Sequence, residues 1–364
     1  MESYKNLFSS IKIQQLTLKN RITAAAMTLN WVDNEGFVDS RVENFYVKVA
    51  RGGAGLIIFE ATSISSKRRS PNNRTMAVYD DKFIPGLRQV VEKIHAEGTV
   101  VFLQLHDGLV STKRSPEDLA QWEIEEIKND FIEAAKRAQQ AGFDGVEIHM
   151  VHRGTLADFL SKMTNNRTDN YGRSIQGRTR LAAEVIVGIK EACGESFPVS
   201  CRILGDEFMI GGNTPKDSSA IAAILEANGA DIISLSAGGR VKKRDNNLTT
   251  TLPDEYSYWR AWPTAEWPDA TNAYLGEEIK KTVRIPVMVA GKIGNPVVAE
   301  EVLLTKKADL VAMGRAIVAD PYLPVKVLEG NWESVVRCTY CKYCRQEVRA
   351  GRSLSCILWN HVRN

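Results

Sequence analysis

The sequence has no long apolar run and little net charge. No stretch reaches the ~18–20 consecutive apolar residues that a membrane span needs, and the formal net charge is only +3 over 364 residues. A balance this close to neutral gives no argument for a nucleic-acid or membrane partner. The opening residues, MESYKNLFSSIKIQQ, also lack the charged-then-apolar pattern of a signal peptide. We therefore expect a cytoplasmic protein.

Cysteine is equally scarce over most of the chain. Only Cys193 and Cys201 occur in the first 336 residues, whereas four cysteines follow between residues 337 and 356. In a reducing cytoplasm, clustered cysteines indicate metal or redox chemistry more often than structural disulfides. The end of the chain is therefore expected to form a segment of its own, 331–364, after a larger unit over 1–330.

That larger unit alternates short apolar runs with amphipathic stretches of helical period. Eight strand–helix units in a row predict a parallel sheet, and eight is the number that closes into a TIM (β/α)8 barrel. A doubly wound open sheet is the alternative, but eight units without a domain break favour closure. The candidate strands are 21–27, 55–60, 99–105, 143–149, 198–202, 231–236, 286–290 and 308–313, and the candidate helices are 42–51, 84–95, 124–140, 179–192, 217–228, 274–282 and 297–305.

The last two predicted strands each run into a glycine followed by a cation. These pairs are Gly291-Lys292, in AGKIGNP, and Gly314-Arg315, in MGRAIVADP. Glycine allows close backbone approach, and free N–H groups at such a turn attract anions. The loops after strands seven and eight are the usual phosphate cradle of this barrel, so the pattern predicts a phosphate site.

Several long motifs resemble the old yellow enzyme family of FMN-dependent oxidoreductases. These motifs are LTLKNRITAAAM, GGAGLIIFEA, AGFDGVEIHMVH, FLSKMTNNRTDNYGRS and MGRAIVADP. The resemblance implies FMN across the top of the barrel, with the phosphate held by the glycine–cation pairs. The residues that it implies along the ring system are Ala25, Ala26, Met27, Thr28, Ala61, Gln104 and Arg202. The residue-level alternative for Arg202 is an ion pair with Asp206 or Glu207.

The terminal cysteines have the spacing C-x2-C-x2-C-x11-C, at Cys338, Cys341, Cys344 and Cys356. Four thiolates can hold zinc or an iron–sulfur cluster. Three ligands spaced by two, with a distant fourth, are more typical of a cluster. The arrangement resembles the iron–sulfur branch of the family, which includes 2,4-dienoyl-CoA reductase, enoate reductases and trimethylamine dehydrogenase. That resemblance implies one [4Fe-4S] cluster.

A histidine pair, His149 and His152, ends the fourth predicted strand, and Arg153 follows it. We take these three residues as candidate catalytic residues, because two imidazoles can polarise a carbonyl conjugated to an alkene. The family's reductases carry a proton-donating tyrosine two residues after the second histidine, where this chain has Gly154. Candidate replacements are Asp107, Tyr256, Tyr258, Tyr274 or water.

The leading hypothesis is reduction of an activated C=C bond in an enoate, enone or dienoyl-CoA. An amine dehydrogenase and a non-catalytic electron-transfer subunit are the alternatives. Larger members of the branch carry an FAD and nicotinamide half, and this chain ends eight residues after Cys356. We therefore expect electrons from a partner protein or subunit, or directly from NADH or NADPH, and a homo-oligomeric assembly.

Basic residues gather in several loops that would follow strands at the barrel mouth. A positive rim would steer anions, and one hypothesis is therefore an acidic substrate such as a carboxylate or a CoA thioester. The alternative is that these residues are ordinary solvated charges of surface loops. A long loop, 238–272, carries three tryptophans and is expected to act as a lid. The rim residues are Lys67, Arg68, Arg69, Arg74, Lys113, Arg114, Arg240, Lys242, Lys243 and Arg244.

Overall fold

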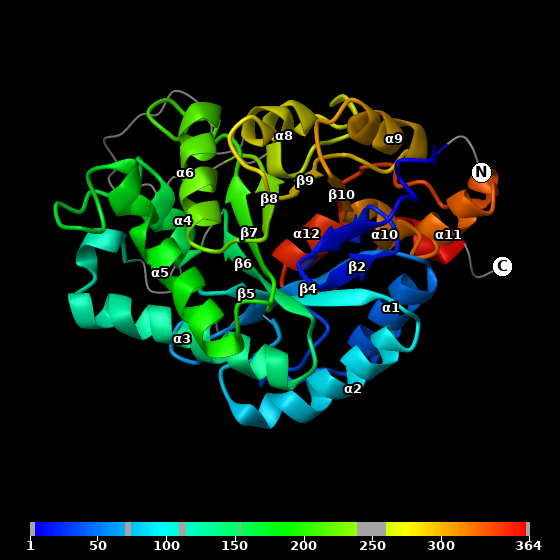
Figure 1. Cartoon of the computed structure of the whole chain (residues 1–364). Coiled ribbons are helices and arrows are strands. Elements are labelled where there is room, and N and C mark those ends of the chain that lie inside the picture. Colours follow the sequence, from blue (N-terminus) through cyan, green and yellow to red (C-terminus); the bar gives the residue numbers. More distant parts are fainter. Residues whose placement is uncertain (1–3, 70–73, 109–113, 153, 239–259, 362–364) are drawn as a thin grey trace.

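The centre of the fold is a closed barrel of eight parallel strands, with the neighbour order β10-β3-β4-β5-β6-β7-β8-β9 (Figure 1). A computed structural model describes residues 4–69, 74–108, 114–152, 154–238 and 260–361. The closed ring confirms the predicted TIM barrel, and each predicted strand overlaps one of its strands. These are β3 (Ile22–Ala24), β4 (Leu56–Ser63), β5 (Val100–His106), β6 (Gly145–Met150), β7 (Val199–Leu204), β8 (Ile232–Ser236), β9 (Val287–Ala290) and β10 (Leu310–Met313).

Helices surround the barrel, and the seven predicted ones are all present with small shifts at their ends (Figure 1). Local chemistry fixes where they begin. The Asp39 carboxylate, for example, accepts from the backbone N–H groups of Arg41 and Val42 and so caps the first helix. The predicted helices are α1 (Ser40–Arg51), α2 (Ile84–His95), α3 (Gln121–Gln140), α5 (Ile175–Cys193), α6 (Pro215–Ala227), α8 (Ala273–Lys280) and α9 (Pro296–Leu304).

Sequence reasoning missed the shorter elements. A hairpin of three-residue strands, β1 and β2, precedes the barrel, and its Ile13 and Leu18 pack with inward-facing barrel residues such as Leu56 and Phe102. The hairpin therefore closes the apolar floor of the barrel. The missed elements are β1 (Ile11–Ile13), β2 (Leu16–Leu18), α4 (Thr155–Leu160), α10 (Arg315–Ala319), α11 (Leu323–Leu328) and α12 (Tyr343–Arg349).

The cysteine-bearing segment packs on the barrel beside the loop that follows β3. The backbone N–H of Leu354 donates to the Leu29 carbonyl at 2.7 Å, and the Trp31 indole donates to the Leu354 carbonyl at 2.9 Å. The Asn30 side chain donates to the carbonyls of Val348 and Arg352. Two segments more than 300 residues apart in sequence are thus joined by one backbone–backbone hydrogen bond and by three that side chains donate. Within the described ranges, no helix is long and apolar enough to cross a membrane.

A buried ion pair ties α5 to the start of β8. The Lys190 ammonium lies 2.7 Å from the Asp231 carboxylate, and their side chains are only 4% and 6% exposed. Lys190 also donates to the carbonyls of Glu195 and Phe197, and Asp231 accepts from the backbone N–H of Val199. Because these hydrogen bonds satisfy both charges, the pair can be buried at an acceptable cost.

Asp231→Asn should lower the free energy of unfolding by about 3–5 kcal/mol, because Lys190 would keep a buried charge without its counter-ion. The midpoint of urea unfolding measures this loss. Glu278→Gln, which breaks the exposed pair of Lys281 and Glu278, is the matched control and should cost less than about 1 kcal/mol. Equal midpoints for the two variants would contradict the prediction.

Candidate functional site

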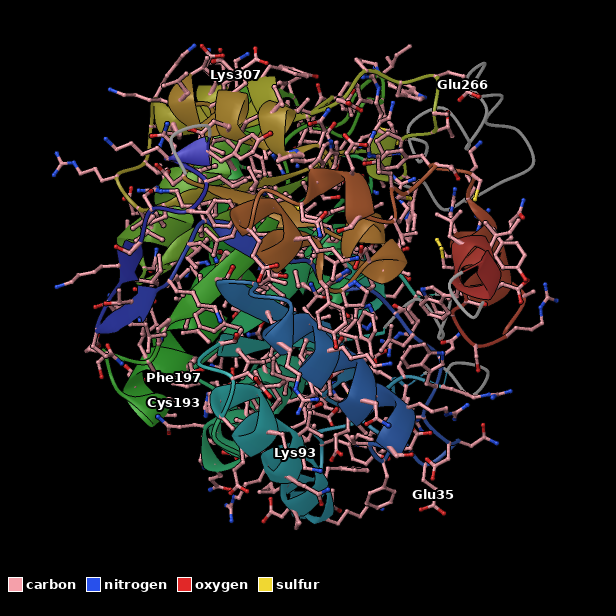
Figure 2. The ribbon with its side chains drawn as sticks, turned by 90° about the vertical axis from the view of Figure 1, so that its right-hand side faces the viewer. Glu35, Lys93, Cys193, Phe197, Glu266 and Lys307 are labelled. Atoms are coloured by element: carbon pink, nitrogen blue, oxygen red, sulfur yellow. The ribbon has the colours of Figure 1, made fainter. Side chains whose placement is uncertain are left out.

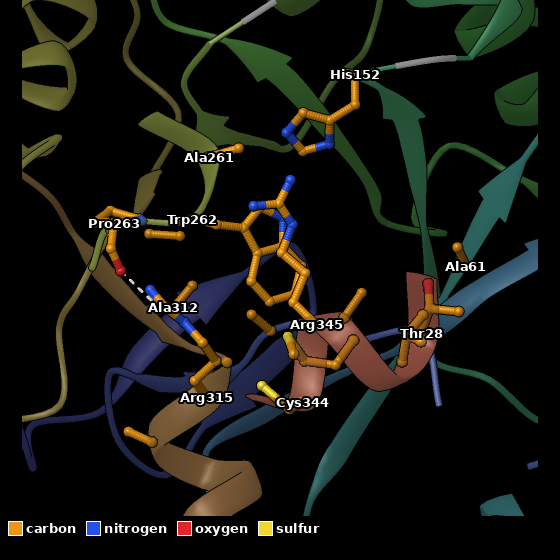
Figure 3. A pocket seen from close by; sticks show the side chains of 18 of the residues that line it. Thr28, Ala61, His152, Ala261, Trp262, Pro263, Ala312, Arg315, Cys344 and Arg345 are labelled. Carbon is orange, nitrogen blue, oxygen red and sulfur yellow. Dashed lines mark hydrogen bonds between the residues drawn. The ribbon is translucent and has the colours of Figure 1, made fainter. Parts of the chain in front are cut away.

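One cavity of about 290 Å³ opens at the carboxyl ends of the barrel strands (Figure 3). Side chains from β4 to β7, from the loops after β3, β9 and β10, and from α12 line it. It brings together every described residue that we predicted for the flavin and for the histidine pair, whereas Arg153 lies outside the described residues. The predicted residues on its wall are Ala25, Ala26, Met27, Thr28, Ala61, Gln104, His149, His152, Arg202, Gly291, Lys292, Gly314 and Arg315.

A buried glutamate that sequence reasoning missed organises the polar side of this cavity. Glu147, on β6, is 0% exposed and accepts from the Gln104 amide at 2.6 Å and from the Ser200 hydroxyl at 3.2 Å. The guanidinium of Arg202 lies 3.9 Å from the same carboxylate. Gln104, Glu147 and Arg202 therefore form one group across β5, β6 and β7. The charged neighbour of Arg202 is thus Glu147, and the alternative of an ion pair with Asp206 or Glu207 is not the arrangement found.

The two predicted phosphate turns lie side by side at the ends of β9 and β10, which pair with each other. Neither glycine has room for a side chain. A Cβ on Gly291, whose φ is +143°, would come within 2.6 Å of the Asn272 amide, and one on Gly314 would come within 2.9 Å of the Met27 sulfur. Both glycines line the cavity, each packed against the side chain of another loop.

The side chains of Lys292 and Arg315 turn toward the loop that follows residue 259. Lys292 donates to the carbonyls of Ala265, at 2.8 Å, and of Trp267, while Arg315 donates to the Pro263 carbonyl at 2.7 Å (Figure 3). Both predicted phosphate cations thus hold the described part of the predicted lid over the cavity. Trp262, from the same loop, lines the cavity.

Three histidines, rather than two, meet at the other side of the cavity. The His106 and His149 rings are in edge-to-face contact, with centroids 4.7 Å apart, and the His149 and His152 centroids are 6.0 Å apart. Desolvation, together with the neighbouring His106, His152 and Arg202, holds the pKa of His149 well below its usual value. Ser236 lies 3.2 Å from His152 Nε2. A neutral imidazole at His149 can donate one hydrogen bond to an oxygen atom.

Gly154, which stands where the family's reductases carry a tyrosine, borders the His149 ring. A Cβ there would lie 3.4 Å from His149 Nδ1. Among the proposed substitutes for the missing tyrosine, Asp107 is excluded, because its carboxylate accepts from Arg68 at 2.6 Å and from the Thr155 hydroxyl. Tyr274 is absent from the cavity lining. Tyr256 and Tyr258 lie outside the described residues.

Three of the five described residues of the expected positive rim are paired with acidic side chains. Arg68 is only 7% exposed and pairs with Asp107 and Asp130. Lys67 pairs with Glu126 at 2.5 Å. Arg114 pairs with Glu123 at 2.5 Å, and Arg69 donates to the carbonyls of Asn34 and Thr75. The remaining described residue is Arg74, and outside the described residues lie Lys113, Arg240, Lys242, Lys243 and Arg244.

The four terminal cysteines line one small hollow next to the main cavity. Cys344 lines both, and the Tyr340 backbone N–H donates to the Cys338 sulfur at 3.4 Å. In the described ranges no three cysteine, histidine or acidic side chains converge to metal-ligand distances. Cys193, by contrast, lies on the far side of the molecule from α12, which is drawn in red in Figure 2.

The wall between cavity and hollow is built by α12. Its Arg345 and Arg349 line the cavity together with Val348 and Leu354. Sequence reasoning missed both arginines, because nothing in their spacing from Cys344 indicates which side of a short helix meets the cavity.

Comparison with known proteins identifies the family. The model of the NADH:flavin oxidoreductase / NADH oxidase family matches residues 6–115 and 108–333. The chain belongs to this family. It is 36% identical over 362 residues to the NADH oxidase of Thermoanaerobacter brockii, in an alignment that covers 94% of the chain. It is 31% identical over 401 residues to the cinnamate reductase of Clostridium sporogenes, in an alignment that covers 98% of the chain.

A solved structure agrees with this assignment. The 2-naphthoyl-CoA reductase complex superposes with a TM-score of 0.87 at 27% identity, over 98% of the chain and 57% of that protein. The two curated relatives are covered over 53% and 58% of their length. The chain therefore spans about half of the length of these proteins. The family match confirms the predicted resemblance to the old yellow enzyme family.

Next to Ala61, on β4, lies a buried carboxyl group, Glu60. One of its oxygens accepts from the Leu29 backbone N–H at 3.0 Å, and the other has no partner. Burial raises the pKa of Glu60 from 4.5 to about 8, against the opposing effect of the Leu29 hydrogen bond. The protonated form is thus favoured in the folded protein at neutral pH.

Because the pKa of Glu60 is higher in the folded protein than in the unfolded chain, protonation of Glu60 stabilises the fold. This stabilisation is fully present below about pH 4.5 and is lost as the pH rises to about 8. Glu60→Gln should remove up to about 4 kcal/mol of that pH dependence. Chemical unfolding of both proteins at pH 5 and pH 8 measures the difference. The prediction fails if wild type and variant lose the same free energy between these two values.

Proposed function

We propose that this chain is the flavin-containing part of an FMN- and [4Fe-4S]-dependent oxidoreductase that reduces an activated C=C bond. The observation that carries the proposal is one cavity in which the two glycine–cation turns, the Gln104–Glu147–Arg202 group and a histidine pair meet next to the cysteine hollow. FMN bound there would supply hydride to the substrate and could also exchange single electrons with a cluster.

The residues present fit FMN. Gly291 and Gly314 line the cavity at the two glycine–cation turns that would hold the phosphate. Arg202, whose Nε has no partner, can donate to the pyrimidine edge of the ring system, and Gln104 can do so from β5, on the other side of β6. A cation at that edge stabilises negative charge on the reduced ring.

The histidine pair would bind the oxygen that activates the alkene. His149 Nδ1 is buried and has no partner, and the lowered pKa of His149 keeps the ring neutral. A neutral ring binds the oxygen by hydrogen bonding and does not protonate it. Since Gly154 has no donor group, we propose that the proton for the alkene comes from water.

The donor set fits an iron–sulfur cluster. Four cysteines around one hollow, with an N–H···S hydrogen bond already formed at Cys338, are the ligands and the contacts that such clusters use. We propose that residues 331–364 bind the cluster and that 1–330 bind FMN. Zinc is the alternative that metal analysis would distinguish.

Two other functions are less well supported. A protonated amine is a poor substrate for a cavity whose described lining contains no aspartate or glutamate. A purely electron-transferring subunit would not need the histidine pair.

We propose that electrons come from NADH or NADPH, or from an additional half of the kind that would account for the greater length of the relatives. We also propose a cytoplasmic homo-oligomer, an assembly and location that remain predictions.

Cys344→Ser should abolish cluster binding, because serine replaces one of four thiolate ligands. Iron and sulfide content and the visible spectrum after anaerobic purification measure the loss. Cys193→Ser, at a cysteine far from the hollow, is the matched control and should retain its iron. Equal iron in both variants would exclude the terminal cysteines as ligands.

His149→Ala should lower the rate at which an unsaturated acid reoxidises the dithionite-reduced protein by roughly 100-fold, a typical effect of losing one activating group. Stopped-flow absorbance under anaerobic conditions measures this rate. Flavin content should be unchanged in the variant. A rate equal to that of wild type would remove the histidine from the proposed role.

A further inference from the structure

A tyrosine just before α12 forms part of the wall between the cavity and the cysteine hollow. Among the described residues, Arg315, Tyr340 and Cys344 line both spaces. Arg315 belongs to a glycine–cation turn and Cys344 is a proposed cluster ligand, whereas Tyr340 has no part in the function proposed above. Its half-buried side chain nevertheless borders both proposed cofactor sites.

The backbone of Tyr340 belongs to the cysteine hollow. The residue lies between Cys338 and Cys341, and its N–H donates to the Cys338 sulfur at 3.4 Å. Its φ is +55°, and that of Lys342 is +69°. Left-handed backbone is unfavourable for residues other than glycine and persists where the surroundings hold it. Ligation of the cysteines on either side would hold this loop, and with it the position of the tyrosine ring.

The side chain of Tyr340 reaches both glycine–cation turns. Its ring centroid lies 4.8 Å from the guanidinium carbon of Arg315 and 5.4 Å from the ammonium nitrogen of Lys292. Its hydroxyl group lies against Gly294, where a Cβ would come within 2.6 Å of the oxygen. A cation within about 6 Å of the centroid of an aromatic ring is attracted to the ring face. One ring therefore restrains the cations of both turns.

Both cations also bond to the loop that follows residue 259. Lys292 donates to the carbonyls of Ala265 and Trp267, and Arg315 donates to that of Pro263. A side chain that is already held near a binding site loses less freedom when the ligand binds. The ring thus favours positions of Lys292 and Arg315 that are close to the phosphate turns.

We propose that Tyr340 positions Lys292 and Arg315 for the phosphate of FMN, and that ligation of the cluster fixes Tyr340 for this role. The two cofactors then bind cooperatively, because each favours the same arrangement of one loop. This inference rests on the proposed function, since it takes FMN at the turns and the cluster in the hollow. Tyr340 is a positioning residue, because it acts through the two cations.

The test compares FMN with riboflavin, which has the same ring system and no phosphate. Both are titrated into the full-length protein, freed of flavin but retaining its iron, and quenching of flavin fluorescence gives the two dissociation constants. Their ratio isolates the phosphate contact. Binding of riboflavin shows that a variant still folds around the flavin ring.

Tyr340→Leu should lower the preference for FMN over riboflavin by about 5- to 30-fold, the range of a cation–ring contact. Tyr340→Phe retains the ring and should retain the wild-type preference. Tyr343→Leu is the matched control, because Tyr343 lines the hollow but is absent from the cavity lining. This variant should also retain the wild-type preference.

Cys341→Ser tests the link to the cluster, at a cysteine that lines the hollow and not the cavity. Iron analysis should show loss of the cluster, and the preference for FMN should fall as far as in Tyr340→Leu. A wild-type preference in the iron-free variant would overturn the coupling. Iron retained in this variant would contradict both the cluster ligands and the coupling.

A wild-type preference in Tyr340→Leu would overturn the role of Tyr340 and leave the proposed FMN site intact. An equal loss in Tyr340→Phe would assign the effect to the hydroxyl group and exclude the ring. If the wild-type protein bound FMN no more tightly than riboflavin, the proposed phosphate site and this inference would fail together.

Discussion

The pairing of β10 with β3 is the constraint on which the site depends. Val311 pairs with Ile22 and Met313 with Ala24, and the Ala25 N–H then donates to the Met313 carbonyl at 3.1 Å. This pairing closes the ring, because it joins its first strand to its last. It also puts the loop after β3 next to the turn at Gly314. The chain that follows β10, including α10 and the cysteine segment, therefore leaves the barrel at the edge of the cavity.

A second consequence of closure is the layering inside the barrel. At the floor, inward residues such as Leu56 and Phe102 pack with the hairpin. Near the carboxyl ends, the inward residues are Gln104, Glu147 and Arg202, which neutralise one another in part. A buried carboxylate costs several kcal/mol unless it is paired and hydrogen-bonded. Glu147 therefore fixes the positions of both partners, and those are the side chains proposed to meet the flavin.

Sequence reasoning found what depends on local pattern and missed what depends on register and docking. The eight strands follow from their apolar runs, and the two turns that line the cavity after β9 and β10 follow from the glycines at strand ends. Glu147 could be recognised as a partner of Gln104 only once their strands were known to pair in register. The acidic partners of the rim residues were missed for a related reason, because Glu126 and Asp130 lie on α3, far along the chain from Lys67 and Arg68. The pattern of eight strand–helix units was enough to predict the fold. Which charged side chains pair with each other could be known only from their neighbours in the folded structure.

The position of α12 joins two properties that the sequence presents separately. Successive residues of a helix point about 100° apart, so Cys344 and Arg345 can face the cysteine hollow and the cavity from neighbouring positions. The helix itself is held by Asn30, which donates to the Val348 carbonyl, and by the Leu354 N–H on Leu29. These contacts anchor the helix to the loop that also carries the proposed flavin residues. The helix α12 therefore carries both Cys344, on the side where electrons would enter, and the buried Arg345. Residues 29 and 30, in the short stretch after β3, hold this part of the chain in place.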